Sequence, residues 1–221
     1  MPSAKTIFNN DQKLMRLIAG KYGRRVLVKD GKADCRPTTE KVRGAIFSTL
    51  SSRQGLEGIA ILDLYAGTGA LGFEALSRGA DKVIFVERNK HQVRLIGENA
   101  KLLQVESQVR CEEMDALSFL KEAATGKKVV LLGKEIVRGF EVVFADPPYD
   151  EHPGDVLISE LLQSKLLLES ATVVIEGPPE LVLHSQVSVG SRALTCFKQR
   201  IYGDTALWYY NEGGIIRKGG N

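Results

Sequence analysis

The chain has 221 residues, of which 43% are hydrophobic and 26% charged, a composition typical of one large or two small globular domains. No stretch approaches the roughly 18 apolar residues of a membrane-spanning helix, and the first ten residues have no apolar core of secretory-signal length. The cysteines Cys35, Cys111 and Cys196 have no paired spacing, which argues against a disulfide framework and a zinc site and favours a reducing cytoplasm.

The net charge of +3 is unevenly distributed along the chain. Residues 1–55 carry 12 Lys and Arg against 4 Asp and Glu, a net charge of +8, and the rest of the chain has a net charge of −5. A basic segment of this kind attracts a polyanion such as nucleic acid. A solvated face that keeps the protein soluble explains it equally well, so charge alone leaves both interpretations open.

The N-terminal quarter predicts two short strands and a helix. Residues 15–28 contain two apolar runs around the turn-rich Gly20–Gly23. Thr38 or Thr39 can cap a helix whose first turn contains Glu40. Apolar residues then recur every four positions and predict a buried stripe that ends near residue 50: Val42, Ile46 and Leu50.

From residue 59 onwards, short apolar runs alternate with amphipathic helical patterns. The predicted strands are 59–62, 82–86, 108–111, 141–145 and 171–175, and the predicted helices are 70–78, 90–103 (capped by Asn89), 116–122 and 155–166. This alternation is typical of an α/β fold with a parallel sheet covered on both faces. A hairpin around Tyr202–Thr205 follows, and residues 123–139 are longer than a simple connection needs.

In an open α/β sheet, ligands bind beyond the carboxyl ends of the strands. The first predicted strand is followed by Gly67, Gly69 and Gly72 in the dinucleotide pattern GxGxxG. Glu87 follows Gly67 by 20 residues, as suits an acid that accepts hydrogen bonds from ribose hydroxyls. Three glycines can also mark a tightly packed turn, and a nicotinamide dehydrogenase is a live alternative.

The carboxylate of Asp63, just before the glycine turn, argues for a different cofactor. An anion there would repel the pyrophosphate of a nicotinamide dinucleotide. S-adenosylmethionine instead carries an ammonium and a sulfonium at one end and adenosine at the other. Asp63 would serve its amino-acid end, Glu87 its ribose hydroxyls and Asp115 its adenine amine.

The fourth predicted strand ends at Asp146-Pro147-Pro148-Tyr149, which resembles the [DNS]-P-P-[YFW] motif of amino-methyltransferases. An exocyclic base amine is a poor nucleophile, and a side-chain oxygen with a loop carbonyl can accept both of its N–H bonds and aim the nitrogen at a methyl group. Prolines stiffen such a loop, and an aromatic ring offers a stacking face. A plain turn is the alternative interpretation, and a carbon methyltransferase would need a thiolate that this loop lacks.

Several longer segments resemble the RsmD family of bacterial ribosomal RNA guanine-N2 methyltransferases, from Met15 to about Tyr210. They are residues 15–20, 23–25, 36–43, 62–80 and 85–87, together with Asp115-Ala116 and residues 146–149. The resemblance implies a Rossmann-like, seven-stranded methyltransferase sheet with an N-terminal β-hairpin extension. It also implies S-adenosyl-L-methionine as donor and a guanine of 16S rRNA as acceptor, within a small-subunit particle. The leader 1–14 and residues 123–139 depart from the family pattern.

These inferences define the candidate residues and the expected organisation. Residues 1–55 form a basic RNA-binding extension, residues 56–221 form the methyltransferase domain, and we expect a cytoplasmic protein with no metal and no membrane partner. The expected catalytic residues are Asp146, Pro147, Pro148 and Tyr149. The expected cofactor-binding residues are Asp63, Tyr65, Ala66, Gly67, Gly69, Glu87, Arg88, Asp115, Ala116 and Asp146. The expected RNA-binding residues are Arg16, Lys21, Arg24, Arg25, Arg36, Thr38 and Arg43, with Thr38 near the active site by resemblance only.

Three rival functions remain open at the level of sequence. The same transfer chemistry suits a DNA-adenine or protein-amide methyltransferase. The glycine turn suits a nicotinamide dehydrogenase, and the fold suits a non-catalytic RNA-binding assembly factor. The intact loop at residues 146–149 argues against the last of these.

Overall fold

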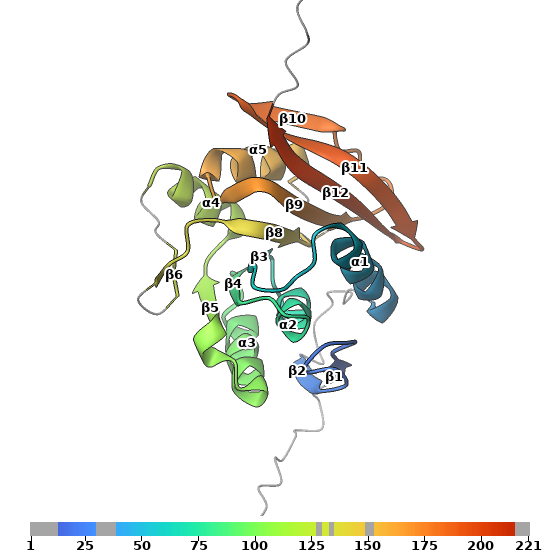
Figure 1. The fold of residues 1–221 in the computed structure, drawn as a ribbon, viewed down its shortest axis with the longest axis vertical. Helices are drawn as coiled ribbons and strands as arrows, with labels where there is room; N and C mark the ends of the chain where they lie inside the picture. Colours follow the sequence, from blue (N-terminus) through green and yellow to red (C-terminus); the bar gives the residue numbers. More distant parts are fainter. Residues whose placement is uncertain (1–12, 30–38, 127–129, 133–134, 149–152, 215–221) are drawn as a thin grey trace, which may run out of the picture.

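A computed structural model describes residues 13–29, 39–126, 130–132, 135–148 and 153–214, and its centre is an eight-stranded sheet (Figure 1). The strand order is β10-β11-β12-β9-β8-β3-β4-β5. The strands are β3 (Ala60–Leu64), β4 (Lys82–Glu87), β5 (Val109–Glu113), β8 (Phe140–Ala145), β9 (Leu167–Gly177), β10 (Gln186–Val189), β11 (Arg192–Tyr202) and β12 (Thr205–Gly214). Strands β3, β4, β5, β8 and β9 pair in parallel, and β12, β11 and β10 continue the sheet antiparallel.

This architecture confirms the predicted α/β fold and the C-terminal hairpin. It corrects the expected number of strands, because β10 pairs with β11 and adds an eighth strand at the edge of the sheet. β10 has only four residues, and its side chains are at most half-buried. So short and exposed a strand has a weak hydrophobic pattern and is not predicted from the sequence.

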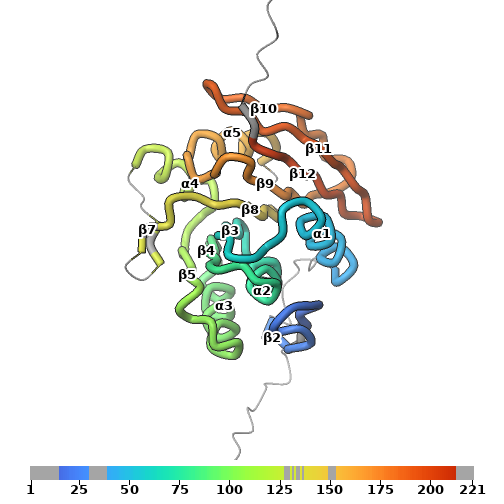
Figure 2. Tube along the Cα trace, in the orientation of Figure 1, coloured from blue at the N-terminus to red at the C-terminus, as the bar shows by residue number. Residues whose placement is uncertain are grey.

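Helices cover both faces of the sheet (Figure 2). One layer contains α1 (Glu40–Arg53), α2 (Ala70–Ser77) and α3 (Lys90–Leu103), and the other contains α4 (Ala116–Ala124) and α5 (Asp155–Ser164). A short 3₁₀ turn, η1 (Glu106–Gln108), leads into β5. Alternate strand residues point to opposite layers, so Phe85 and Phe144 join the core under α1–α3, whereas Val86 and Ala145 join the core under α4 and α5.

Helix α1 packs directly on the sheet. Its N-cap is Thr39, whose hydroxyl accepts a hydrogen bond from the Val42 amide, as predicted. The helix continues three residues past the predicted end, to Arg53, and Phe47 meets Phe144 of β8 with ring centroids 5.7 Å apart. The apolar stripe of α1 therefore shares one core with the central strands.

The N-terminal hairpin is present as predicted. β1 (Lys13–Arg16) and β2 (Val26–Lys29) pair antiparallel and form a separate two-stranded sheet beside α2 and α3. Its apolar side chains Leu17, Tyr22 and Leu27 are buried in the same core as α1.

The region 123–139, whose conformation the sequence did not predict, contains a second small sheet. β6 (Leu131–Leu132) and β7 (Glu135–Ile136) pair antiparallel. Among the described residues, no helix is both long and apolar enough to cross a membrane.

Candidate active site

The carboxyl ends of the parallel strands bring the predicted cofactor and catalytic residues to one edge of the sheet. β3 lies between β4 and β8, and Leu64 pairs with Val86 on one side and Ala145 on the other. Tyr65 and the glycine turn therefore begin beside Asp146. On the other side of β4, Glu87 pairs with Glu113 of β5, two residues before Asp115.

The glycine turn between β3 and α2 adopts the left-handed backbone that its glycines permit. The φ angles are +57° at Tyr65, +54° at Gly67 and +80° at Gly69. A Cβ atom at Gly67 would meet no atom within 4 Å, so the turn borders open space there. At Gly72 a Cβ atom would lie 2.3 Å from the Phe85 ring, so this glycine serves the close packing of α2 on β4.

Glu87 is held in place at this edge by two backbone amides. One carboxylate oxygen accepts a hydrogen bond of 2.8 Å from the Gly67 amide, and the other accepts one of 2.7 Å from the Asn89 amide. Asn89 caps α3, as predicted. Each carboxylate oxygen has more than one lone pair, so an oriented Glu87 can still accept from hydroxyl groups.

Asp63 is only 2% exposed and joins β3 to α2 by accepting a 2.9 Å hydrogen bond from the Gly72 amide. Burial raises the pKa of its carboxyl well above the usual value. The hydrogen bond from Gly72 opposes this rise in pKa, and the charges of Asp146 and Glu87 add to it. Three acidic side chains thus repel one another at one edge. A cationic ligand would offset that repulsion, so these residues fit the ammonium and sulfonium of S-adenosylmethionine.

Asp115 stands at the N-terminal end of α4. Its side chain accepts a 2.8 Å hydrogen bond from the Ser118 amide and caps α4, whose first residue, Ala116, is buried. Its remaining lone pairs are the acceptors that the predicted adenine contact would use. Arg88 is exposed beside Glu87.

The proline loop starts at the end of β8. Asp146 is half-buried, Pro147 is buried and Pro148 is half-buried, while Tyr149 lies outside the described residues. The charge of Asp146 contributes to the raised pKa of Asp63, so the two carboxyls lie close enough to interact.

Four of the predicted RNA-binding residues are exposed on the N-terminal segment: Arg16, Lys21, Arg24 and Arg25. Lys21 and Arg25 both lie over the ring of Tyr22, at 5.2 and 5.7 Å from its centroid. The turn that carries them lies at the C-terminal ends of α2 and α3, where the backbone amide of Lys21 donates to the Ser77 carbonyl and the guanidinium of Arg25 donates to the Leu102 carbonyl. The predicted residues Arg36 and Thr38 lie outside the described residues.

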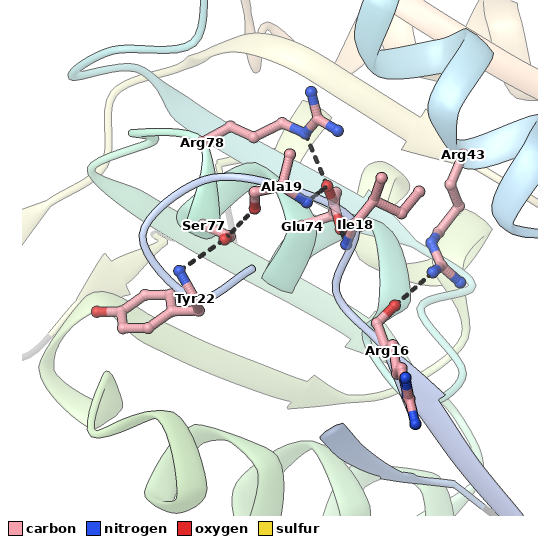
Figure 3. A network of polar contacts seen from close by, with 8 residues as sticks. All are labelled: Arg16, Ile18, Ala19, Tyr22, Arg43, Glu74, Ser77 and Arg78. Atoms are coloured by element: carbon pink, nitrogen blue, oxygen red, sulfur yellow. Dashed lines mark hydrogen bonds and ion pairs between the residues drawn. The ribbon is translucent and has the colours of Figure 1, made fainter. Parts of the chain in front are cut away.

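The structure corrects the expectation for Arg43. Its side chain is 2% exposed, and its guanidinium donates a 2.7 Å hydrogen bond to the carbonyl of Arg16 (Figure 3). Burial lowers the pKa of Arg43, and the negative charges of Glu74 and Glu40 oppose that shift. Arg43 therefore supports the N-terminal segment from the interior and does not present its charge to a phosphate.

Sequence reasoning missed a buried clasp that holds the N-terminal segment on α2. Glu74 is fully buried, and its carboxylate accepts from the amides of Ile18 and Ala19, at 2.7 and 3.1 Å, and from the Arg78 guanidinium at 2.7 Å (Figure 3). Ser77 accepts from the Tyr22 amide and donates to the Ala19 carbonyl. The available signal was a pair of polar residues, Glu74 and Ser77, at helical spacing in an otherwise apolar helix.

A second buried contact links the hairpin to the glycine turn. The amide side chain of Asn99 exchanges two hydrogen bonds with the backbone of Val28, at 2.8 and 2.9 Å, and donates a longer one of 3.4 Å to the Thr68 carbonyl. Asn99 is completely buried. β2 is thereby fixed to the same turn that borders the candidate cofactor site.

Comparison with known proteins agrees with this geometry. The family described as conserved hypothetical protein 95 matches residues 15–211. The Bacillus subtilis protein named "Putative rRNA methyltransferase YlbH" is 32% identical over 200 residues, which cover 90% of this chain and 100% of that protein. The ribosomal RNA small subunit methyltransferase D of Haemophilus influenzae is 32% identical over 163 residues, covering 73% of this chain and 78% of that protein.

A solved structure matches nearly the whole chain. The Escherichia coli structure described as "Putative methyltransferase yhhF" superposes with a TM-score of 0.73 at 25% identity, covering 91% of this chain and 99% of that one. Fold and site together define an S-adenosylmethionine-dependent methyltransferase. Within that class, the chain belongs to the RsmD family of ribosomal RNA methyltransferases.

Proposed function

We propose that this protein transfers a methyl group from S-adenosyl-L-methionine to the exocyclic N2 amine of a guanine in 16S rRNA of the small ribosomal subunit. The observation that carries the proposal is the pairing of Leu64 with Ala145, which sets Asp146 beside the glycine turn. The name of the Haemophilus influenzae relative supports ribosomal RNA of the small subunit as the substrate. That subunit is assembled in the bacterial cytoplasm, so we assign the reaction to that compartment.

The proposed cofactor site consists of the glycine turn and the three acidic residues around it. When bound, S-adenosylmethionine supplies an electrophilic methyl group on its sulfonium. We assign Asp63 to the cationic amino-acid end, Glu87 to the ribose hydroxyls and Asp115 to the adenine amine. The open space at Gly67 and the fixed orientation of Glu87 support this arrangement. The neighbouring residues Tyr65, Ala66, Gly69, Arg88 and Ala116 complete the proposed site.

The proposed catalytic group is the loop that begins at Asp146. The carboxylate of Asp146 and a carbonyl of the Pro147–Pro148 turn accept the two N–H bonds of the guanine amine, and Tyr149 stacks on the base. Acceptors held in this way orient the nitrogen lone pair and stabilise the positive charge that grows on nitrogen during transfer. Two adjacent prolines restrict the backbone, so little ordering is left for the moment of reaction.

The proposed substrate must present its guanine outside a base-paired stack, because a paired amine could not enter this edge of the sheet. Cations of the N-terminal segment then contact phosphates around the target nucleotide. We assign this role to Arg16, Lys21, Arg24, Arg25 and Arg36, with Thr38 near the site. The substrate proposed is RNA within a small-subunit particle.

The proposal is tested with Asp146→Ala, which removes the side-chain acceptor, and the control Asp81→Ala, an exposed aspartate just before β4. Methyl transfer from labelled cofactor to small-subunit particles should fall by at least about 10²-fold in Asp146→Ala, the scale on which a lost transition-state contact acts. Cofactor affinity should be weakened at most, and Asp81→Ala should match the wild type. Wild-type turnover in Asp146→Ala would overturn the assignment.

The substrate is tested separately by offering purified particles, naked 16S rRNA, DNA and protein to the wild type. Mass mapping of the labelled RNA identifies the modified nucleotide and its atom. Label in DNA adenine or in a protein amide, or on a guanine atom other than N2, would contradict the proposed substrate while leaving the methyl-transfer chemistry intact.

A further inference from the structure

A second group of cations lies far from the N-terminal quarter in sequence, on the face of β11 that meets α1. Lys198 pairs with Tyr209 and Arg200 pairs with Leu207, and both partners belong to the core under α1. Paired residues of neighbouring strands point to the same face, so both cations share the face of α1. The Lys198 ammonium donates a 2.8 Å hydrogen bond to the hydroxyl of Thr49 in the middle of α1.

A bulge in β11 adds an aromatic ring to this face. The register between β11 and β12 shifts between Cys196 and Lys198, and the extra residue is Phe197. The ring of Phe197 lies 6.1 Å from that of Tyr209, and the guanidinium of Arg53 lies over it at 4.1 Å from the centroid. Phe197 is nevertheless 39% exposed. An exposed ring beside an oriented guanidinium offers a flat, cationic surface.

Strand register places this surface near the candidate active site. Ala145 pairs with Ile175, Ile175 with Trp208, and Trp208 with Gln199. Arg200 therefore stands at about the level of Asp146, three strands away, a separation of about 14 Å at the usual strand spacing. Helix α1 lies between this part of β11 and the N-terminal hairpin, so the two basic regions flank one face of the protein (Figure 1).

The charged side chains of β11, and those of α1 after its first residue, are all basic. β11 contains no Asp or Glu, and α1 contains none after Glu40. The outward residues in the middle of α1 are small, and Gly44 borders open space. Ser48, Ser51 and Ser52 of the same helix are exposed. Glu176 of β9 shares this face of the sheet through its pairing with Leu207, but it is only 5% exposed. A polyanion can therefore reach the middle of α1 and the neighbouring part of β11 without meeting an exposed acidic side chain of either element.

We propose that Arg53, Phe197, Lys198 and Arg200, here named the β11 surface, bind the RNA segment that flanks the target guanine. Arg53 and Arg200 contact phosphates, Phe197 stacks on an unpaired base, and Lys198 joins the surface to α1. Phosphate contacts by Arg and base stacking on aromatic rings are the two general modes by which proteins bind single-stranded RNA. The inference rests on the proposed RNA methyltransferase function and extends its RNA contacts to the C-terminal hairpin.

The test compares Arg53→Glu/Arg200→Glu with the control Lys121→Glu/Arg138→Glu, which makes the same charge change on exposed residues outside β11 and α1. RNA binding is measured as a function of salt on small-subunit particles. The β11-surface variant should bind at least about tenfold more weakly, and its log–log salt slope should be shallower by about 1.4, as expected for two single-strand phosphate contacts. The control variant should keep the wild-type slope.

Phe197→Ala tests the stacking contact without changing charge. It should weaken RNA binding about tenfold with the salt slope unchanged, whereas Phe197→Trp should keep the affinity. Cofactor affinity and the thermal transition of every variant should match the wild type, which separates a lost contact from misfolding. If a charge-reversed variant fails to fold, Arg53→Gln/Arg200→Gln provides the same comparison.

The outcomes separate this inference from the function on which it rests. If the wild type methylates particles and the β11-surface variants bind RNA like the control, the surface is not an RNA contact, while the methyltransferase proposal stands. If the wild type neither binds nor methylates RNA, both proposals fall.

Discussion

Asp63 contributes both to the packing of the fold and to the candidate cofactor site. Its carboxyl is buried, accepts the Gly72 amide and faces the charges of Asp146 and Glu87. The folded protein consequently raises the pKa of this carboxyl well above its usual value, so the folded state holds the proton more tightly than the unfolded state does.

This difference in pKa fixes the direction in which the free energy of unfolding changes with pH. Above about pH 4 the unfolded chain releases the Asp63 proton first, so the wild type should lose stability relative to Asp63→Asn as pH rises through the folded-state pKa. The slope should not exceed about 1.4 kcal/mol per pH unit. Urea unfolding of both proteins across a pH series measures it, and a difference that grows in favour of the wild type would contradict the argument.

At the scale of residues, the sequence predicts which side chains lie near one another better than it predicts which of them are exposed to solvent. The glycine turn, Glu87 and Asp146 follow strand ends, and parallel strands bring such ends together, so their proximity could be predicted. Arg43 could not be assigned from charge, because a count of cations does not say which face of a helix each one occupies. Its spacing from Ile46, Phe47 and Leu50 is that of a buried stripe, and that signal was available.

At the scale of elements, α2 anchors the N-terminal segment through its buried clasp. Glu74 accepts two backbone amides and one guanidinium N–H, three donors around one carboxylate. An amide in its place would direct its own N–H bonds at those donors. A buried polar group without a matching partner costs about 1–3 kcal/mol.

Glu74→Gln should therefore loosen residues 13–29 while the central sheet remains folded. Hydrogen exchange should become at least about tenfold faster at Ile18, Ala19 and Tyr22, and trypsin should cleave near Arg24 more readily. Glu98→Gln, an exposed change on α3, is the matched control. Unchanged protection of the N-terminal amides would show that the clasp does not hold the segment.

The elements themselves were mostly predictable because their hydrophobic patterns are strong. The apolar stripe of α1, which recurs every four residues, indicates a helix, and the continuous apolar runs of β3 and β4 indicate buried strands. β6 and β7 escaped prediction because two residues cannot establish a period, and β10 escaped because its four side chains are exposed or only half-buried and give a weak hydrophobic pattern. The bulge at Phe197 escaped for a related reason, since one inserted residue does not alter the composition of a strand.

At the scale of the whole molecule, the proposed boundary between residues 55 and 56 crosses a continuous core. Phe47 packs on Phe144, and the stripe of α1 covers Val174, Leu207 and Tyr209 of the sheet. Removal of residues 1–55 would expose this apolar face to water, at a cost of about 25 cal/mol per Å².

A chain consisting of residues 56–221 should therefore lack the cooperative thermal transition of the full chain. Circular dichroism during heating measures the transition, and the binding of a hydrophobic dye reports the exposed face. The full chain in the same buffer is the reference. A sharp transition near the temperature of the full chain would show that residues 56–221 form an independent domain.

The contact between Thr49 and Lys198 joins residues 149 positions apart, so it can form only long after α1 has been synthesised. A ribosome adds about 5–20 residues per second, so roughly 7 to 30 s separate the emergence of α1 from that of the strands that cover it. Until β8 and the later strands emerge, the nascent helix exposes Ile46, Phe47 and Leu50. The native packing of α1 is therefore completed only after β11 and β12 have left the exit tunnel.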